Sequence, residues 1–101
     1  MITENIARRA SPIDVLEDVT YLLNYYEFIA SAIRYGDLDE KLLKESLRGM
    51  LCNTYELTRD LISYRRTKSR MPNLLLYEHL EWLYLRWFIH EYQRPVLTRI
   101  E

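Results

Sequence analysis

Residues 11–36 read SPIDVLEDVTYLLNYYEFIASAIRYG, and their pattern predicts a long helix. Ser11 is a suitable N-cap, Pro12 suits the first helical position, and Gly36 marks the end. Apolar residues recur every three or four positions, which is the period of one helix face. We therefore expect an amphipathic helix over about residues 12–35. Its expected core positions are Val15, Val19, Leu22, Tyr26, Ile29 and Ile33.

A second helix is predicted directly after the first, over about residues 38–66. Asp37 and Glu40 resemble the start of a capping box, and apolar residues then continue at helical spacing as far as Tyr64. Gly49 interrupts this pattern only mildly. Because the link between the two helices is so short, the sequence favours an antiparallel helical hairpin.

A third helix is predicted over about residues 74–93, between Pro72 and Pro95. Apolar side chains occupy most of its circumference, so two neighbours in one thin bundle cannot cover it completely. We therefore expect residues 1–101 to form one all-α domain of three long antiparallel helices, an elongated bundle that forms a homodimer through the third helix. The expected protein interface comprises Leu76, Trp82, Leu83, Arg86, Trp87 and Ile89.

Trp82 is the side chain that we expect to matter most for recognition. Helical spacing places Trp82 on a narrow polar strip beside Arg86, and both residue types are enriched among interface hot spots. The alternative is that Trp82 packs on the first helix inside the monomer.

The composition fits a soluble helical protein. Hydrophobic residues make up 49% of the chain and charged residues 29%, and two glycines are too few for the many turns of an all-β fold. The formal net charge of -1 gives no overall attraction to a polyanion. The N-terminal segment lacks the apolar core of a signal peptide, and no run approaches the roughly 18 apolar residues that cross a bilayer. A single cysteine, Cys52, fits a reducing compartment, so we expect a cytoplasmic protein that binds no membrane.

Catalytic chemistry is not expected. His79 and His90 lie about 16 Å apart along a helix, which is too far to share a metal ion. Cys52 is expected to be a buried structural thiol. The sequence contains no P-loop, and two glycines could not easily build a phosphate-binding loop. We therefore predict no catalytic residues, no metal site and no cofactor.

Two polar clusters are candidate sites. Asn24, Glu27 and Arg34 share one helix face and could form a polar patch, although a solvated face or a structural brace is the alternative. In an antiparallel hairpin, basic residues also gather at one pole of the bundle, where they could bind phosphate unless nearby acids cancel their field. These residues are Arg8, Arg9, Arg65, Arg66, Lys68 and Arg70.

Two stretches of the chain resemble a known family. Residues 22–30 read LLNYYEFIA, residues 33–40 read IRYGDLDE, and a tryptophan-bearing helix follows. With these features the chain resembles a helical family of bacterial and prophage proteins that is described as a domain of unknown function (the 4760 type). The resemblance covers about residues 14–87. It implies a helical fold and a bacterial or phage source, and it implies no activity and no catalytic residues.

The function favoured by these observations is a non-enzymatic protein–protein interaction module. Its small size and the phage resemblance suggest an inhibitor or adaptor that blocks a host macromolecule. The alternative is nucleic-acid or nucleotide binding through the basic pole. The sequence does not identify the partner.

Overall fold

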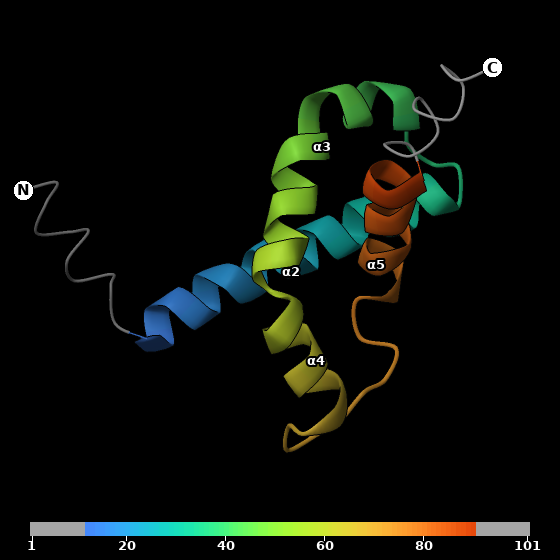
Figure 1. Cartoon of the computed structure of the whole chain (residues 1–101). Coiled ribbons are helices and arrows are strands. Elements are labelled where there is room, and N and C mark those ends of the chain that lie inside the picture. The colour runs from blue at the N-terminus through green and yellow to red at the C-terminus, as the bar shows by residue number, and fades with distance from the viewer. Residues whose placement is uncertain (1–11, 91–101) are drawn as a thin grey trace, which may run out of the picture.

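The structure, a computed structural model, describes residues 12–90. Within this range all regular secondary structure is helical, which confirms the all-α class. The elements are α2 (Pro12–Arg34), α3 (Glu40–Leu57), α4 (Arg59–Thr67), α5 (Glu78–Tyr84) and a π-helical turn, η1 (Leu85–His90) (Figure 1). No helix in residues 12–90 is both long enough and apolar enough to span a membrane.

The first helix has nearly the predicted bounds, and its end is set by Gly36. This residue has a φ of 82°, a left-handed conformation that costs glycine little. The Gly36 amide donates to the carbonyl of Ile33, and the Asp37 amide donates to that of Ala32. This pair of hydrogen bonds is a Schellman motif, which satisfies the last carbonyls of α2.

The predicted second helix is divided in two at Thr58. Its start is capped by Asp39, whose carboxylate accepts from the Leu42 amide at 3.2 Å. The Thr58 hydroxyl donates to the Thr54 carbonyl at 2.7 Å, a bond within the helix that often bends it. α3 therefore ends at Leu57, and α4 follows with a different axis (Figure 1).

The helices cross rather than form the predicted antiparallel bundle. The axes of α2 and α3 meet at a wide angle in Figure 1, and axes that are not parallel in projection are not parallel in space. The link between them is longer than predicted, since α3 begins only at Glu40. Because α5 is apolar on several sides, crossing helices can cover it better than parallel neighbours.

The predicted third helix begins late because Tyr77 has a left-handed backbone. Its φ is 60°, which is uncommon for a residue with a side chain. Residues 73–77 form turns instead, with the Glu78 amide donating to the carbonyl of Leu75. After Tyr84 the α-helix continues as η1. The predicted part beyond residue 90 lies outside the described residues.

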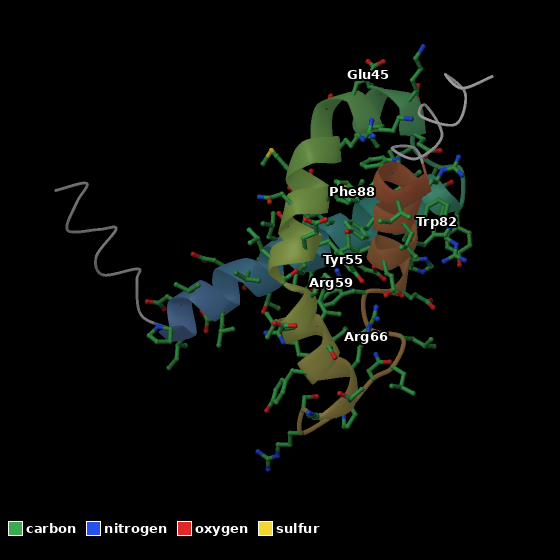
Figure 2. The ribbon with its side chains drawn as sticks, viewed as in Figure 1. Glu45, Tyr55, Arg59, Arg66, Trp82 and Phe88 are labelled. Carbon is green, nitrogen blue, oxygen red and sulfur yellow. The ribbon has the colours of Figure 1, made fainter. Side chains whose placement is uncertain are left out.

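The core forms where α5 lies against α2 and α3, with Ile62 of α4 below it. Tyr84 of α5 stacks on Tyr55 of α3 at a centroid distance of 4.4 Å and on Phe88 at 5.5 Å. Figure 2 labels Tyr55 and Phe88. Val15 and Leu22, two predicted core residues, are exposed instead. The large side chains that are fully buried are Leu23, Leu51, Ile62, Leu80, Leu83 and Trp87.

Candidate interaction surface

The predicted polar patch on α2 contacts α5 and the turn before it. The hydroxyl of Tyr77 donates to Asn24 Oδ1 at 3.1 Å. Glu27 Oε1 accepts from the Leu80 amide at 2.7 Å, and Oε2 accepts from the His79 amide at 3.4 Å. These amides belong to the first turn of α5, where helical N–H groups have no partner in their own helix. Glu27 therefore caps α5 from another helix.

Trp82 lies between two arginines. The guanidinium carbons of Arg34 and Arg86 are 5.2 and 5.6 Å from the centroid of its ring, within the range of cation–π attraction. Arg34 also approaches His79 Nδ1 at 3.5 Å. Asn24, Glu27 and Arg34 thus contact other residues of this chain. These contacts match the structural brace that the sequence left open as the alternative to a binding patch.

Glu40, the first residue of α3, fixes the other end of α5. Its carboxylate accepts from Arg86 at 2.6 and 3.0 Å and from Trp87 Nε1 at 3.0 Å. The hydrogen bond from Arg86 is the main reason that the pKa of Glu40 lies below its ordinary value. Glu27 and Glu40 therefore hold α5 from opposite ends.

The residues predicted to form a dimer seam lie largely inside the chain. Leu83 and Trp87 are 0% exposed, so they cannot contact a partner in this fold. Leu76, Trp82 and Ile89 pack against the core and are partly buried. Arg86 is exposed but engaged by Glu40. α2 and α3 cover α5 from two sides, whereas Leu74, Leu75 and Leu85 of the predicted third helix are exposed. The homodimer through this helix stays a prediction.

The predicted basic pole is partly engaged by internal hydrogen bonds. Arg65 donates to the Thr20 hydroxyl at 2.8 Å, and Arg66 donates to the Leu76 carbonyl at 2.7 Å and to Glu81 at 3.2 Å. Lys68 and Arg70 are exposed at the end of α4 and in the following turn. Arg8 and Arg9 lie outside the described residues.

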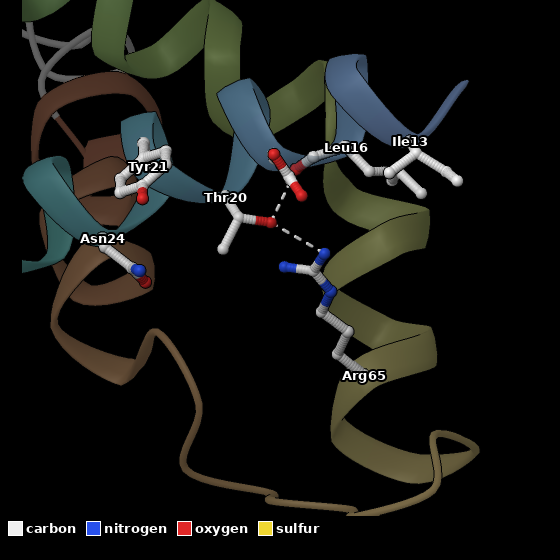
Figure 3. A pocket seen from close by; sticks show the side chains of 7 residues that line it. Ile13, Leu16, Thr20, Tyr21, Asn24 and Arg65 are labelled. Carbon is white, nitrogen blue, oxygen red and sulfur yellow. Dashed lines mark hydrogen bonds between the residues drawn. The ribbon is translucent and has the colours of Figure 1, made fainter. Parts of the chain in front are cut away.

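An open groove lies between α2 and α4. It has a volume of about 540 Å³, and Figure 3 shows Arg65 reaching across it toward Thr20. Ile13, Leu16 and Tyr21 supply its apolar wall. Glu17, Thr20 and Asn24 add polar groups, so the groove is a mixed surface in which Arg65 is engaged by Thr20.

The outer face of α2 carries an aromatic stripe that sequence reasoning missed. Tyr21, Tyr25, Phe28 and Tyr35 are between 57% and 75% exposed. With Ala32 they are spaced by four, three, four and three residues, so they form one row on a helix. That spacing could have revealed the row, but the core prediction followed only the apolar row that contains the buried residues Tyr26, Ile29 and Ile33. We call these five residues the α2 stripe.

A shallow hollow lies beside the C-terminal half of the α2 stripe. Its volume is about 250 Å³, and small residues form its floor. The lining residues are Phe28, Ser31, Ala32, Tyr35, Asp37 and Leu38. The row therefore has large rings toward its N-terminal end and a depression toward its C-terminal end.

The comparisons with known proteins bear on the residues just described. A family model described as Domain of unknown function (DUF4760) matches residues 2–87. The chain belongs to this family. Comparison with curated proteins and with solved structures gave no match.

The stretches that carry the DUF4760 resemblance include the contacts that dock α5. Residues 22–30 contain Asn24, which binds Tyr77, and Glu27, which caps α5. Residues 33–40 contain Gly36, which ends α2, and Glu40, which binds Arg86. These contacts give this part of the DUF4760 sequence a structural role in the chain.

Burial keeps one thiol and two phenols of the DUF4760 domain in their neutral forms at neutral pH. Burial raises the pKa of Cys52 to about 11, although Arg48 one turn away opposes the shift. Burial, together with hydrogen bonds to Glu81 and Glu56, raises the pKa values of Tyr55 and Tyr84 to about 12. Among residues 12–90, no three His, Cys, Asp or Glu residues are grouped to bind a metal ion.

Proposed function

We propose that this domain is a non-enzymatic protein–protein interaction module that contacts another polypeptide through the α2 stripe. The observation that carries the proposal is a row of four aromatic side chains, each more than half exposed: Tyr21, Tyr25 and Phe28 on one face of α2, and Tyr35 directly after its last residue. Tyrosine and phenylalanine are enriched in protein interfaces relative to the remaining surface. Contiguous exposed apolar surface commonly marks such a contact.

The chemistry of the stripe suits a protein partner. From Tyr21 to Tyr35 the charged residues are Glu27 and Arg34. The Glu27 carboxylate is turned toward α5, and the Arg34 guanidinium lies over the Trp82 ring. The surface is therefore neutral and amphipathic, with ring faces for packing and tyrosine hydroxyls that can hydrogen-bond at the rim. A helix of the partner can lie along the stripe, whose length is about 21 Å at 1.5 Å per residue.

Photo-crosslinking tests the proposal without knowledge of the partner. A benzoylphenylalanine in place of Phe28 should form a covalent adduct with a polypeptide in cells of the native source. The matched control carries the same group in place of Leu57, which is 77% exposed on α3 and outside the stripe. The proposal would be contradicted if the two positions gave equal yields of adduct. It would also be contradicted if the folded protein with the crosslinker at position 28 gave no adduct.

The finer elements of the hypothesis remain proposals. A small binding module suits an inhibitor or adaptor that blocks a host macromolecule, and the family resemblance led us to a bacterial or phage source. We also propose a reducing, cytoplasmic location, since Cys52 is a buried free thiol. Nucleic-acid binding through the basic pole stays a prediction that is less favoured, because Arg65 and Arg66 donate to groups within this chain.

A further inference from the structure

We infer that the polypeptide covering the α2 stripe is a second copy of this chain, with the two α2 helices antiparallel about a two-fold axis at Phe28. This inference rests on the proposed function, because it names the partner of the same surface. It differs from the dimer predicted from the sequence, since that seam is largely buried inside one chain.

The first support is the symmetry of the stripe about its central residue. Tyr21 and Tyr35 lie seven residues before and seven residues after Phe28. In an antiparallel pair centred on Phe28, each Tyr21 faces the partner's Tyr35, and the two Phe28 rings meet on the axis. A two-fold interface requires such a self-complementary patch on one molecule.

The second support is the match between large and small residues. The same pairing places Tyr25 opposite Ser31 and beside Ala32, which form the floor of the hollow described above. A ring from one copy can therefore fill the hollow of the other, and the exchange occurs twice. Interdigitation of this kind, with side chains of one helix entering gaps of the next, is how helices pack.

Electrostatics permit two identical faces to meet. Any charged residue on the stripe would face its own kind near a two-fold axis, at a cost of like-charge repulsion. The stripe contains no charged residue, and the neighbouring Glu27 is engaged with α5. The charged residue Asp37 lines the hollow and lies nine residues from the axis at Phe28. At the axis itself, two copies therefore meet without like-charge contact.

The area is sufficient for a modest dimer. An aromatic side chain buries roughly 150–250 Å² when fully covered, so four that are mostly exposed offer roughly 400–700 Å² per copy. Two copies together bury about 800–1,400 Å², near the lower limit for a specific interface. The buried residues of α2 face α3 and α5, so most of the stripe lies on the other side of the helix. At its two ends the stripe approaches other elements: the centroid of the Tyr35 ring lies 5.7 Å from that of the His79 ring, and Tyr21 lines a groove together with Arg65 of α4.

Charge pairing at position 28 tests the inference by sedimentation velocity. The wild type at high micromolar concentration should sediment at twice the chain mass of 12.3 kDa. Phe28→Arg and Phe28→Glu should each weaken self-association at least about tenfold, and an equimolar mixture of the two should restore it, because position 28 faces itself. Leu57→Arg is the matched control and should leave the dimer intact.

The inference would be overturned if the wild type were monomeric, or if both Phe28 variants remained dimeric. It would also be overturned if the mixture of the two variants stayed monomeric although circular dichroism shows each variant to be folded. If the wild type is monomeric but the photo-crosslinker at position 28 still captures a different polypeptide, the inference fails and the proposed function stands. If it captures nothing, both fail.

Discussion

At the scale of single residues, two carboxylates decide where α5 lies. Glu27 reaches from α2 to the amides at the start of α5, and Glu40 reaches from α3 to Arg86 and Trp87 beyond its end. Carboxylates are well suited to the first of these roles, since the N-terminus of a helix carries a partial positive charge. The family resemblance was visible in these residues, but their role as caps depends on contacts more than 40 residues apart in sequence.

Replacement of Glu27 tests this account of the polar patch. Glu27→Ala removes the acceptor for the Leu80 amide and should lower the free energy of unfolding by about 1–2 kcal/mol. Glu27→Gln keeps one oxygen acceptor and should cost less. Urea denaturation measures both, with Glu45→Gln, an exposed carboxylate of α3 (Figure 2), as the control. If Glu27→Ala lowered the free energy of unfolding no more than the control does, Glu27 would not act as a cap of α5.

The ion pair of Glu40 predicts a dependence of stability on pH. Its pKa is lowered in the folded state, so the unfolded chain takes up this proton first as the pH falls. The stabilisation is therefore fully present above the ordinary pKa of about 4.5 and is lost as the pH drops through the lower folded value.

Denaturation of Glu40→Gln and of the wild type over a range of pH should show this contribution. We expect the variant to be less stable by roughly 1 kcal/mol at neutral pH, with the difference shrinking below pH 4.5. A difference that stays constant into the acid range would show that the charge of Glu40 has no part in it.

At the scale of the elements, helix ends were predictable where a local signal sets them. Gly36 predicted the end of α2, and the last residue of this helix, Arg34, lies within two residues of the predicted end. The late start of α5 carried no such signal, because Tyr77 takes a left-handed backbone while its hydroxyl binds Asn24 of another helix. The break at Thr58 was also hidden, since threonine is common inside helices that continue.

The two glycines predict stability changes of opposite sign. Gly36→Ala places a Cβ at a positive φ and should destabilise the protein by about 1 kcal/mol. Gly49→Ala lies inside α3 with no atom within 4 Å of the new Cβ, so it should stabilise by up to about 1 kcal/mol. Thermal denaturation of the two variants compares them directly. Changes of the same sign would contradict the assigned backbone conformations.

At the scale of the whole molecule, the topology was not accessible from the sequence. The periodicity of α2 correctly placed Tyr26, Ile29 and Ile33 in the core, but it did not show that α3 and α5 would cross over this face and leave the α2 stripe exposed. The same packing of α5 buries Leu83 and Trp87 completely. The fold class followed from composition and period, but the arrangement and the candidate site followed from long-range contacts.

Electrostatics at this scale predict that the chain does not bind nucleic acid at physiological salt. The chain has a formal net charge of -1, and Arg65 and Arg66 are engaged internally. Fluorescence anisotropy with a labelled oligonucleotide should therefore show no binding at physiological salt. Binding that weakens steeply with salt would contradict this prediction. If the double variant Lys68→Glu, Arg70→Glu also reduced the salt slope, the basic pole would be the phosphate site.

Oxidative footprinting of the tyrosines tests most directly whether the outer face of α2 is a contact surface between copies. Hydroxyl-radical labelling followed by mass spectrometry compares dilute with concentrated protein, and Tyr64, which is 54% exposed outside the stripe, serves as the internal control. We predict that labelling of Tyr21, Tyr25 and Tyr35 falls as concentration rises while that of Tyr64 stays constant. Labelling that is unchanged at all four tyrosines, or that falls at Tyr64 as much as at the other three, would contradict the account.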